Sequence, residues 1–300
     1  MNTADLIGFV GIGAMGTPMA GNLAKAGYRL VVFDLDATRT AALAREHGVS
    51  VAASLADLGA LATIIITMLP DGKAVRSALC GVNDSFRDCI LERAAKGTRV
   101  IDMSSSSPMQ TRELGALLEL RGFPCIDAPV SGGVKGAVNA TLAIMAGGDI
   151  AIYEYVKPML EKMGSALFHA GPLGAGHAIK ALNNYVSAAG LAATCEALIA
   201  AERFGIDPAV ATDIINASSG MNNTTKNKVR QQMLNGAYAA GFATGLMAKD
   251  VRTALEVAKA MGGPSAYAEH TAGLWNAMER EEGFAADHTA MHRYLAKQKK

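Results

Sequence analysis

Short runs of β-branched and aliphatic residues alternate with longer helix-patterned stretches through the first half of the chain. Such alternation is typical of repeated strand–helix–strand units, which build a mostly parallel sheet with helices on its faces. We therefore predict an N-terminal α/β domain. Its strand candidates are LIGFVGI, RLVVFD, TIIITML, TRVIDMS, PCIDAPV and LAIMAGG.

The pattern changes after about residue 172, where strand-like runs end and glycine, alanine and helix formers dominate. Apolar residues at helical spacing from about Ala175 to Phe204 predict one long helix. Asp207 followed by Pro208 is typical of a capped helix start. We predict an α/β domain over 1–172, then a long connecting helix that leads into an all-helical domain over 173–300.

Three glycines, Gly11, Gly13 and Gly16, lie between the first strand candidate and the helix pattern that follows it. In a Rossmann-type domain the first makes a tight turn, the second lets a pyrophosphate approach the backbone, and the third allows close packing of helix and strand. Asp34 ends the next strand candidate, where a carboxylate can accept hydrogen bonds from ribose hydroxyls. This pattern predicts dinucleotide binding and favours NAD over NADP, although the nearby Arg39 could offset part of the repulsion of a 2′-phosphate.

Composition narrows the function classes. The 300 residues are 50% hydrophobic with a formal net charge of +1, and the terminal KQKK is the one basic run, so electrostatic binding to nucleic acid or anionic lipid is not expected. No apolar run approaches the roughly 20 residues that span a bilayer, and no leader pattern is evident. Four dispersed cysteines indicate reduced thiols in a cytoplasmic protein. His288 and His292 have no evident third ligand, so no metal site is predicted.

Two further clusters carry candidate chemistry. Ser131, Gly132 and Gly133 follow a strand candidate, and their amides and hydroxyl could form a nest for an anion such as a substrate carboxylate, or simply a turn. Lys180 and Asn184 are four residues apart on the long predicted helix and could reach one bound oxygen. The apolar neighbours of Lys180 favour a neutral amine able to accept a proton, whereas most helix lysines are solvated surface.

Four segments, GFVGIGAMGTPMAGNL, DAPVSGGVKGA, GAGHAIKALNN and LMAKDVRTAL, resemble in order and spacing the signature blocks of the β-hydroxyacid dehydrogenases of the 3-hydroxyisobutyrate dehydrogenase type. The resemblance implies a Rossmann-type domain and a helical C-terminal domain in a homodimer or homotetramer. It also implies reversible, NAD(P)-dependent hydride transfer between a small 3-hydroxy acid and its semialdehyde. The substrate would be similar to 3-hydroxyisobutyrate or a more polar analogue.

The same resemblance assigns roles to individual residues. Lys180 matches the catalytic lysine and Asn184 the asparagine that holds the substrate. Ser131, Gly132 and Gly133 match the loop for the substrate carboxylate, and Lys249, with Asp250 beside it, matches a lysine near substrate and nicotinamide. The positions implied to contact the cofactor are Gly11, Gly13, Met15, Gly16, Asp34, Leu69, Pro70, Ser105 and Lys249.

Some alternatives stay open at this level. Asn222, Asn223 and Thr224 are polar where the family tends to carry bulkier apolar residues, so they could select a polar substrate or cap the next helix. The same scaffold serves NADPH-dependent semialdehyde reductases, imine reductases and non-catalytic nucleotide-binding proteins. The lysine at position 180 argues against an imine reductase, and the acidic residue at position 34 argues against an NADPH-dependent semialdehyde reductase. The combination of Lys180, Asn184 and Lys249 argues against a non-catalytic protein.

Overall fold

The computed structural model describes residues 5–298. Residues 1–4 and 299–300, which include the start of the chain and the last two lysines of the KQKK run, lie outside the described range. The chain divides into two compact units, the first ending at Lys180 and the second beginning at Ala181. Each unit is described by itself.

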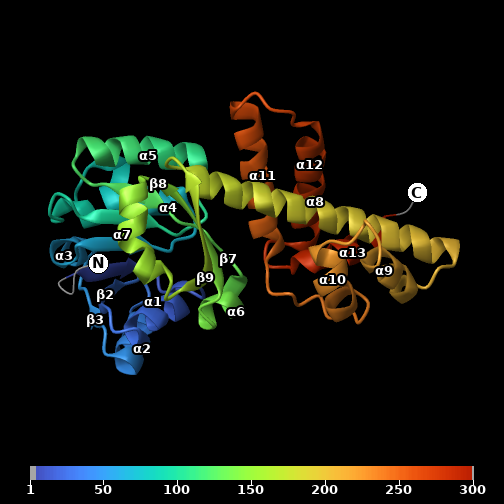
Figure 1. Ribbon diagram of the computed structural model, residues 1–300, viewed down its shortest axis with the longest axis horizontal. Coiled ribbons are helices and arrows are strands. Elements are labelled where there is room, and N and C mark those ends of the chain that lie inside the picture. Colours follow the sequence, from blue (N-terminus) through green and yellow to red (C-terminus); the bar gives the residue numbers. More distant parts are fainter. Residues whose placement is uncertain (1–4, 299–300) are drawn as a thin grey trace. The chain divides into compact units, whose positions relative to one another are not determined.

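The first unit is an α/β domain whose strands and helices largely alternate (Figure 1). Two short 3-10 turns, at Val82–Asp84 and Ile90–Glu92, follow the fourth helix. In chain order the regular elements are β1 (Leu6–Val10), α1 (Gly16–Lys25), β2 (Arg29–Phe33), α2 (Ala37–His47), β3 (Ser50–Val51), α3 (Leu55–Leu61), β4 (Ile64–Thr67), α4 (Gly72–Cys80), β5 (Arg99–Asp102), α5 (Pro108–Leu120), β6 (Cys125–Asp127), β7 (Val130–Ser131), α6 (Gly133–Val138), β8 (Leu142–Gly148), α7 (Ile150–Leu160) and β9 (Gly164–Gly171).

The strands form one sheet in which β3, β2, β1, β4, β5 and β6 are consecutive parallel neighbours. β8 then pairs antiparallel with both β6 and β7, and β9 pairs parallel with β8. This arrangement confirms the predicted Rossmann-type fold with a mostly parallel sheet. The sequence candidates do not include β3 and β9, and the single candidate PCIDAPV covers β6 and only the first residue of β7. Only one of the eight residues of β9 is buried, so this strand lacks the continuous apolar run of a buried strand.

Two hydrophobic clusters cover the faces of this sheet. One includes Met19 and Leu23 of α1 with Val156 of α7, and the other includes Leu79 of α4 with Leu114 of α5. Figure 1 shows α1 and α2 on one side of the strands and α4 and α5 on the other. With both faces covered, the parallel strands read as apolar runs, and all four residues of β4 are buried.

The second unit is helical throughout its regular structure, as predicted. The long helix predicted from the apolar spacing is α8 (Ala175–Phe204), which begins within the first unit. The other elements are α9 (Pro208–Asn216), α10 (Asn223–Asn227), a π-helical turn η3 (Val229–Met233), α11 (Thr244–Ala260), α12 (Ala266–Glu282), a 3-10 turn η4 (His288–Ala290) and α13 (Met291–Lys297). Asp207 caps α9 as predicted.

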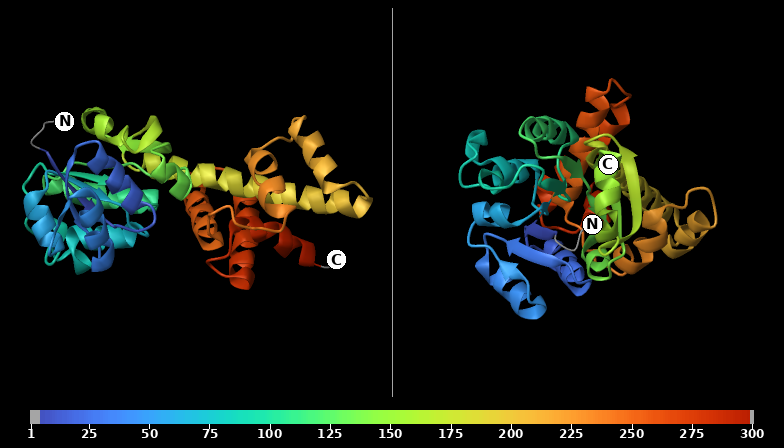
Figure 2. Two further views of the ribbon diagram at one scale, coloured as in Figure 1. Left: turned by 90° about the horizontal axis from the view of Figure 1, so that it is seen from below. Right: turned by 60° about the vertical axis from the view of Figure 1, so that its left-hand side comes forward.

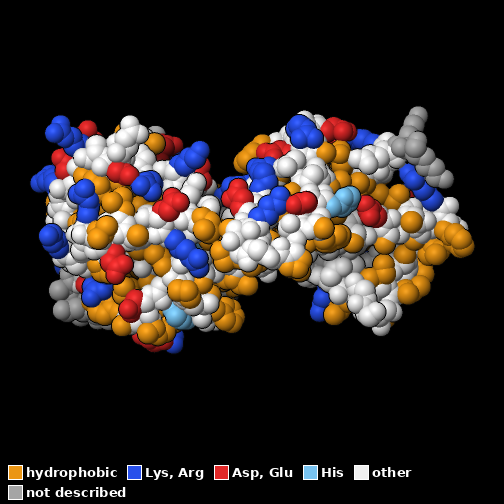
Figure 3. All heavy atoms as spheres, turned by 90° about the horizontal axis from the view of Figure 1, so that it is seen from above, with side chains coloured by type: hydrophobic (Ala, Val, Ile, Leu, Met, Phe, Trp, Pro, Cys, Tyr) orange, Lys and Arg blue, Asp and Glu red, His pale blue; other side chains and the backbone are white. Residues whose placement is uncertain are grey.

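The fully buried Trp275 belongs to the core of this unit, with Leu191 and Cys195 of α8 and Val251 of α11. The two views in Figure 2 show the later helices packed along the part of α8 that belongs to this unit. Within 5–298, no helix is both long and apolar enough to cross a membrane. On the face drawn in Figure 3, acidic and basic side chains are interspersed on each unit.

Candidate active site

The three glycines of the loop after β1 have different steric surroundings. Gly11 has φ of 97°, and a Cβ there would lie 2.3 Å from the carbonyl oxygen of Met68. A Cβ on Gly16 would lie 1.9 Å from the Gly11 oxygen, so this glycine lets α1 approach the loop. A Cβ on Gly13 would meet nothing closer than 3.8 Å. Open space beside a bare backbone at a helix start fits the approach of a pyrophosphate.

Asp34, at the end of β2, is tied directly to this loop. One carboxylate oxygen accepts the backbone N–H of Ile12 at 2.6 Å, and the other accepts that of Asp36 at 2.8 Å. Asp34 therefore holds the glycine loop against the carboxyl end of β2. Each carboxylate oxygen has a second lone pair with which it could accept a ribose hydroxyl.

Arg39 lies beside the same loop. Its Nη1 is the atom 3.8 Å from the Cβ position of Gly13, and its Nε is 3.1 Å from a carboxylate oxygen of Asp36. The side chain is about half exposed, at 53%. Because this cation is already paired with Asp36, it is not placed as an isolated receptor for a 2′-phosphate.

Other residues assigned to the cofactor lie around this loop or at the neighbouring strand ends. Met15 precedes α1 and packs against the core. Leu69 follows β4, and its side chain would lie 3.1 Å from a Cβ on Gly11. Pro70 is exposed, and Ser105, in the turn between β5 and α5, is partly buried. The structure thus brings Leu69 against the glycine loop.

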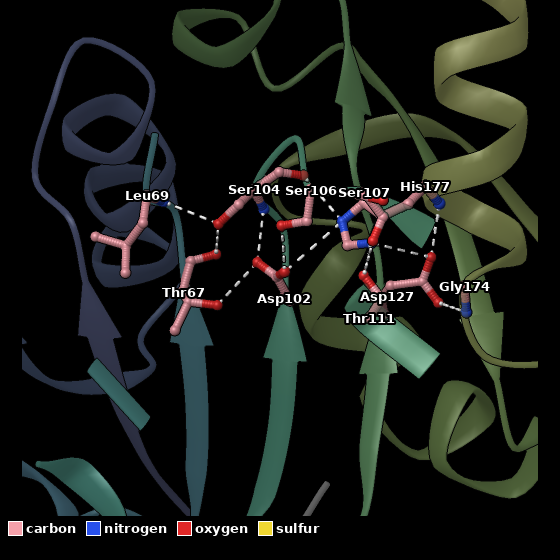
Figure 4. Close-up of polar contacts among 10 residues, drawn as sticks. All are labelled: Thr67, Leu69, Asp102, Ser104, Ser106, Ser107, Thr111, Asp127, Gly174 and His177. Carbon is pink, nitrogen blue, oxygen red and sulfur yellow. Dashed lines mark hydrogen bonds and ion pairs between the residues drawn. The ribbon is translucent and has the colours of Figure 1, made fainter. Parts of the chain in front are cut away.

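A buried polar network that the sequence analysis missed joins the ends of β4, β5 and β6 to the start of α8 (Figure 4). Asp102, the last residue of β5, accepts hydrogen bonds from Thr67 Oγ1, from the Ser104 backbone and from Ser106 Oγ. Ser104 Oγ in turn accepts the backbone N–H of Leu69 at 2.9 Å. The loops that follow β4 and β5 are therefore bonded to each other.

At the other end of the network, Asp127 is hydrogen-bonded to the start of α8. Its carboxylate accepts the backbone N–H of Gly174 at 2.7 Å and that of His177 at 2.6 Å. Burial raises the pKa of Asp127, whereas the charge of His177 and these two N–H donors act in the opposite direction. Asp127 is fully buried and lies beside the positive end of a long helix, where an acidic group is favoured.

Lys180 follows this anchored start, within the first two turns of α8, and Asn184 lies one turn further along the same helix. Asn184 is buried, and its Nδ2 donates to Asp250 of α11 at 2.6 Å. Its Oδ1 accepts from Asn183 Nδ2 at 3.2 Å. Lys249 Nζ is 3.9 Å from the other oxygen of Asp250. Within the second unit, therefore, Asn184, Lys249 and Asp250 lie together.

The second glycine cluster forms an exposed turn between β7 and α6. Ser131 ends β7 and is partly buried, while Gly132 and Gly133 are exposed with φ of 129° and 61°. A Cβ on Gly133 would meet nothing within 4 Å. The turn therefore presents open backbone next to the Ser131 hydroxyl, although α6 is too short to add a helix-end site.

The polar segment before α10 is a helix cap. Asn222 Oδ1 accepts from the backbone of Thr224 and Thr225, and Thr225 Oγ1 accepts from the Asn222 backbone, which completes a capping box. Asn222 Nδ2 donates to Thr194 Oγ1 and to the Gly220 carbonyl. All the hydrogens of the Asn222 amide are thus engaged, so the capping alternative holds for this residue rather than substrate selection.

Within the described range, no group of three or more His, Cys, Asp or Glu side chains is placed to hold a metal ion. A cavity of about 150 Å³ lies between α4 and α5 and has Asp102 and Ser106 in its wall. Its charged lining mixes Lys73 and Arg76 with Glu113 and Asp102.

Comparison with known proteins places each unit in a family. Residues 6–171 match the family described as the NAD binding domain of 6-phosphogluconate dehydrogenase. Residues 174–295 match the family described as NAD-binding of NADP-dependent 3-hydroxyisobutyrate dehydrogenase.

Individual relatives agree over most of the chain. The 2-(hydroxymethyl)glutarate dehydrogenase of Eubacterium barkeri is 37% identical over 259 residues, 86% of this chain and 84% of that protein. The NAD-dependent L-serine dehydrogenase of Pseudomonas aeruginosa is 38% identical over 260 residues, 85% of each. The solved structure of Mycobacterium tuberculosis 3-hydroxyisobutyrate dehydrogenase with L-serine is 36% identical, with a TM-score of 0.87 over 97% of this chain and 99% of that one.

Proposed function

The chain belongs to the β-hydroxyacid dehydrogenase family, and from this membership we propose the residues with which it works and the class of its substrate. It is an oxidoreductase that transfers hydride reversibly between a small 3-hydroxy acid and its semialdehyde with a nicotinamide cofactor. One observation supports the residue assignment most strongly. Lys180 and Asn184 lie one turn apart on α8, and the Asn184 amide is hydrogen-bonded to Asp250.

The first unit holds the cofactor. A bound nicotinamide dinucleotide supplies the hydride acceptor during oxidation. The backbone from Gly11 to Met15, with Gly16 at the start of α1, would hold the pyrophosphate, and Asp34 would accept hydrogen bonds from the ribose hydroxyls. Leu69, Pro70 and Ser105 would contact the cofactor beyond this loop. Asp34 supports a preference for NAD over NADP, because its carboxylate would repel a 2′-phosphate, and Arg39 is paired with the Asp36 carboxylate at 3.1 Å.

The substrate is held at its two polar ends. Ser131 and the backbone of Gly132 and Gly133 receive the carboxylate, with Lys249 as a further cationic partner. Asn184 has one Nδ2 hydrogen left after the bond to Asp250, and this hydrogen donates to the substrate oxygen. Fixing both ends restricts the alcohol to one orientation, which is the main contribution of such groups to rate.

Lys180 moves the proton. In oxidation its neutral amine accepts the hydroxyl proton as the C–H bond breaks, and in reduction its ammonium returns that proton to the carbonyl oxygen. A Lys180→Ala variant is expected to lose about 10³-fold or more in kcat while keeping its cofactor affinity. Lys162→Ala, which removes an exposed lysine of the first unit, is the matched control. Near-normal turnover of the Lys180 variant would show that the assignment is wrong.

The substrate class is a small 3-hydroxy acid, either 3-hydroxyisobutyrate or a more polar analogue such as serine. The relatives named for 3-hydroxyisobutyrate, L-serine and 2-(hydroxymethyl)glutarate share a hydroxymethyl group next to the carbon that bears the carboxylate. A panel of 3-hydroxyisobutyrate, serine, glycerate, 3-hydroxypropionate and threonate, each assayed with NAD and NADP, tests this class. Oxidation of none of them would contradict it.

We further propose a cytoplasmic homodimer or homotetramer. Free thiols support a reducing compartment, since none of the four cysteines forms a disulfide; three are buried and Cys125 is partly buried. Large exposed apolar side chains of the second unit, including Val186, Phe204 and Tyr267, support self-association. Light scattering coupled to gel filtration distinguishes these assemblies from a monomer of 31.0 kDa.

A further inference from the structure

We propose that His177 is a positioning residue, which ties the loops after β4 and β5 to the first turn of α8 and thereby sets where the catalytic Lys180 lies. The inference rests on the proposed function, because it concerns the alignment of the same lysine with the cofactor. His177 carries no assigned role in the dehydrogenase site described above. It is fully buried at the centre of the polar network in Figure 4.

Both ring nitrogens of His177 have partners from other elements. Nε2 lies 3.1 Å from the backbone carbonyl oxygen of Ser104. A carbonyl only accepts, so Nε2 carries a hydrogen and donates it. Nδ1 lies 2.8 Å from Thr111 Oγ1 on α5. The ring therefore bridges the β5 loop and α5, and its orientation is fixed at both nitrogens.

Ser104 belongs to the loop after β5, which also carries a residue assigned to the cofactor. Ser104 Oγ accepts the backbone N–H of Leu69, and Leu69 packs against the glycine loop. The next residue in the chain is Ser105, which is assigned to the cofactor. A bond from His177 to the Ser104 carbonyl therefore holds the peptide unit between Ser104 and Ser105, which belongs to the cofactor-contacting loop.

The backbone of His177 helps to hold the start of α8, the helix that carries Lys180. Its N–H is one of the two that Asp127 accepts at the start of α8. A Cβ on Gly176 would lie 2.1 Å from the Met145 carbonyl of β8, so the helix start is packed too closely against the sheet to slide. Lys180 follows His177 by three residues, on the same side of the helix. One residue thus links the cofactor loop and the helix turn that carries the base.

This link predicts a kinetic effect that differs from loss of stability. Proton and hydride transfer require the alcohol oxygen to meet Lys180 while the carbinol carbon meets the nicotinamide, and a displacement of about 1 Å can cost about 10²-fold in rate. Without the ring, the β5 loop and α8 lose their direct bond. The chemical step should then slow while cofactor and substrate still bind.

The test compares His177→Leu and His177→Gln with the wild-type enzyme. The leucine variant should lose about 10- to 100-fold in kcat, with a larger primary deuterium isotope effect on kcat, while the NADH dissociation constant from fluorescence titration stays within about threefold. The glutamine variant should recover most of the rate, because its amide N–H can reach the Ser104 carbonyl. His169→Leu is the control, since His169 also bonds a backbone carbonyl, that of Gly148 at 2.8 Å, but on exposed β9.

Thr111→Val provides a second variant should the leucine protein fail to fold. It removes the partner of His177 Nδ1, together with the Thr111 bond to the Ser107 carbonyl, and should change kcat and the isotope effect in the same direction. Unchanged kcat and isotope effect in these variants would overturn the proposal, as would a fall in thermal stability with normal turnover per folded molecule. If Lys180→Ala keeps its activity, the proposed function fails. If Lys180→Ala is inactive but the His177 variants are normal, only this inference fails.

Discussion

The Nδ2 atom of Asn184 lies 2.6 Å from a carboxylate oxygen of Asp250, and both side chains are buried. An ionised carboxylate only accepts hydrogen bonds, so this contact decides which end of the amide is nitrogen. The orientation of the residue assigned to the substrate oxygen is therefore set from α11, by the neighbour of Lys249. Asp250 therefore contacts both residues, with one carboxylate oxygen 3.9 Å from Lys249 Nζ and the other bonded to Asn184.

Replacing Asp250 with asparagine should impair catalysis more than folding. The new side chain can offer either an acceptor or a donor to Asn184, so the amide of Asn184 is no longer held one way. We expect kcat/KM for the hydroxy acid to fall by about 10- to 100-fold, with little change in NADH affinity. Asp213→Asn, which loses only an exposed ion pair with Arg230, is the matched control. Equal kcat/KM in both variants would contradict the orienting role.

The glycine loop predicts opposite outcomes for two similar substitutions. Gly13→Ala adds a methyl group where nothing lies within 3.8 Å, so thermal stability should be almost unchanged while the NAD dissociation constant rises by about tenfold or more. Gly11→Ala places the methyl group 2.3 Å from a carbonyl oxygen at positive φ, so the first unit should be clearly destabilised. Calorimetry with cofactor titration separates the two. A Gly13 variant with unaltered affinity would place the phosphates elsewhere.

The four thiols should be unreactive in the folded enzyme. Burial raises the pKa of Cys80, Cys125 and Cys195 to about 12 and also raises that of Cys89. At pH 8 a thiol with a pKa near 12 is thiolate in only about one molecule in ten thousand. Ellman's reagent should therefore label the native protein slowly and label all four thiols in guanidinium chloride. Fast labelling of the native state would show that one of these cysteines is accessible.

Asp287 should make the stability of the second unit depend on pH. Its carboxylate accepts the backbone N–H of Gly241 at 2.8 Å and that of Thr289 at 2.9 Å. Burial acts to raise the pKa of Asp287, but the hydrogen bonds from His288 and Thr289 outweigh it and hold the pKa well below the ordinary 3.8. Because the folded value is the lower one, the stabilisation is complete above about pH 4 and is lost as the pH falls further.

Asp287→Asn should accordingly lower the free energy of unfolding by about 2 kcal/mol at pH 7. The gap from wild type should narrow when the same urea titrations are repeated near pH 3. A gap that stays constant, or widens on acidification, would mean that the carboxylate charge is not what these donors stabilise.

The sequence alone predicted the features that depend on neighbours in the chain. β1, the glycine turn and α1 all lie within residues 6–25, so their spacing is visible in the sequence. The apolar period of α8 predicts its bounds at Ala175 and Phe204. Short or exposed elements were missed. β7 has two residues, and β9 buries too little of its length to show an apolar pattern.

The polar network could not be predicted in the same way. His177 is 50 residues from Asp127 and 73 residues from Ser104, and only the parallel sheet brings the strand ends to one edge. One signal was available, because Asp102 and Asp127 each lie inside an otherwise apolar strand candidate, where a buried carboxylate needs partners. The partners come partly from α8, and no local sequence pattern predicts where that helix packs against the sheet.

The continuity of α8 also constrains how this protein can change length over evolution. His177, Lys180 and Asn184 share one uninterrupted helix, in which each added residue turns everything beyond it by about 100° and advances it by about 1.5 Å. A single-residue insertion between 177 and 184 would send the anchor and the two reactive side chains in different directions. The stretch 82–88, between α4 and β5, has no buried residue and carries no assigned residue, so it can lengthen without that consequence. Insertion scanning should therefore find this protein tolerant there and intolerant over two turns of α8.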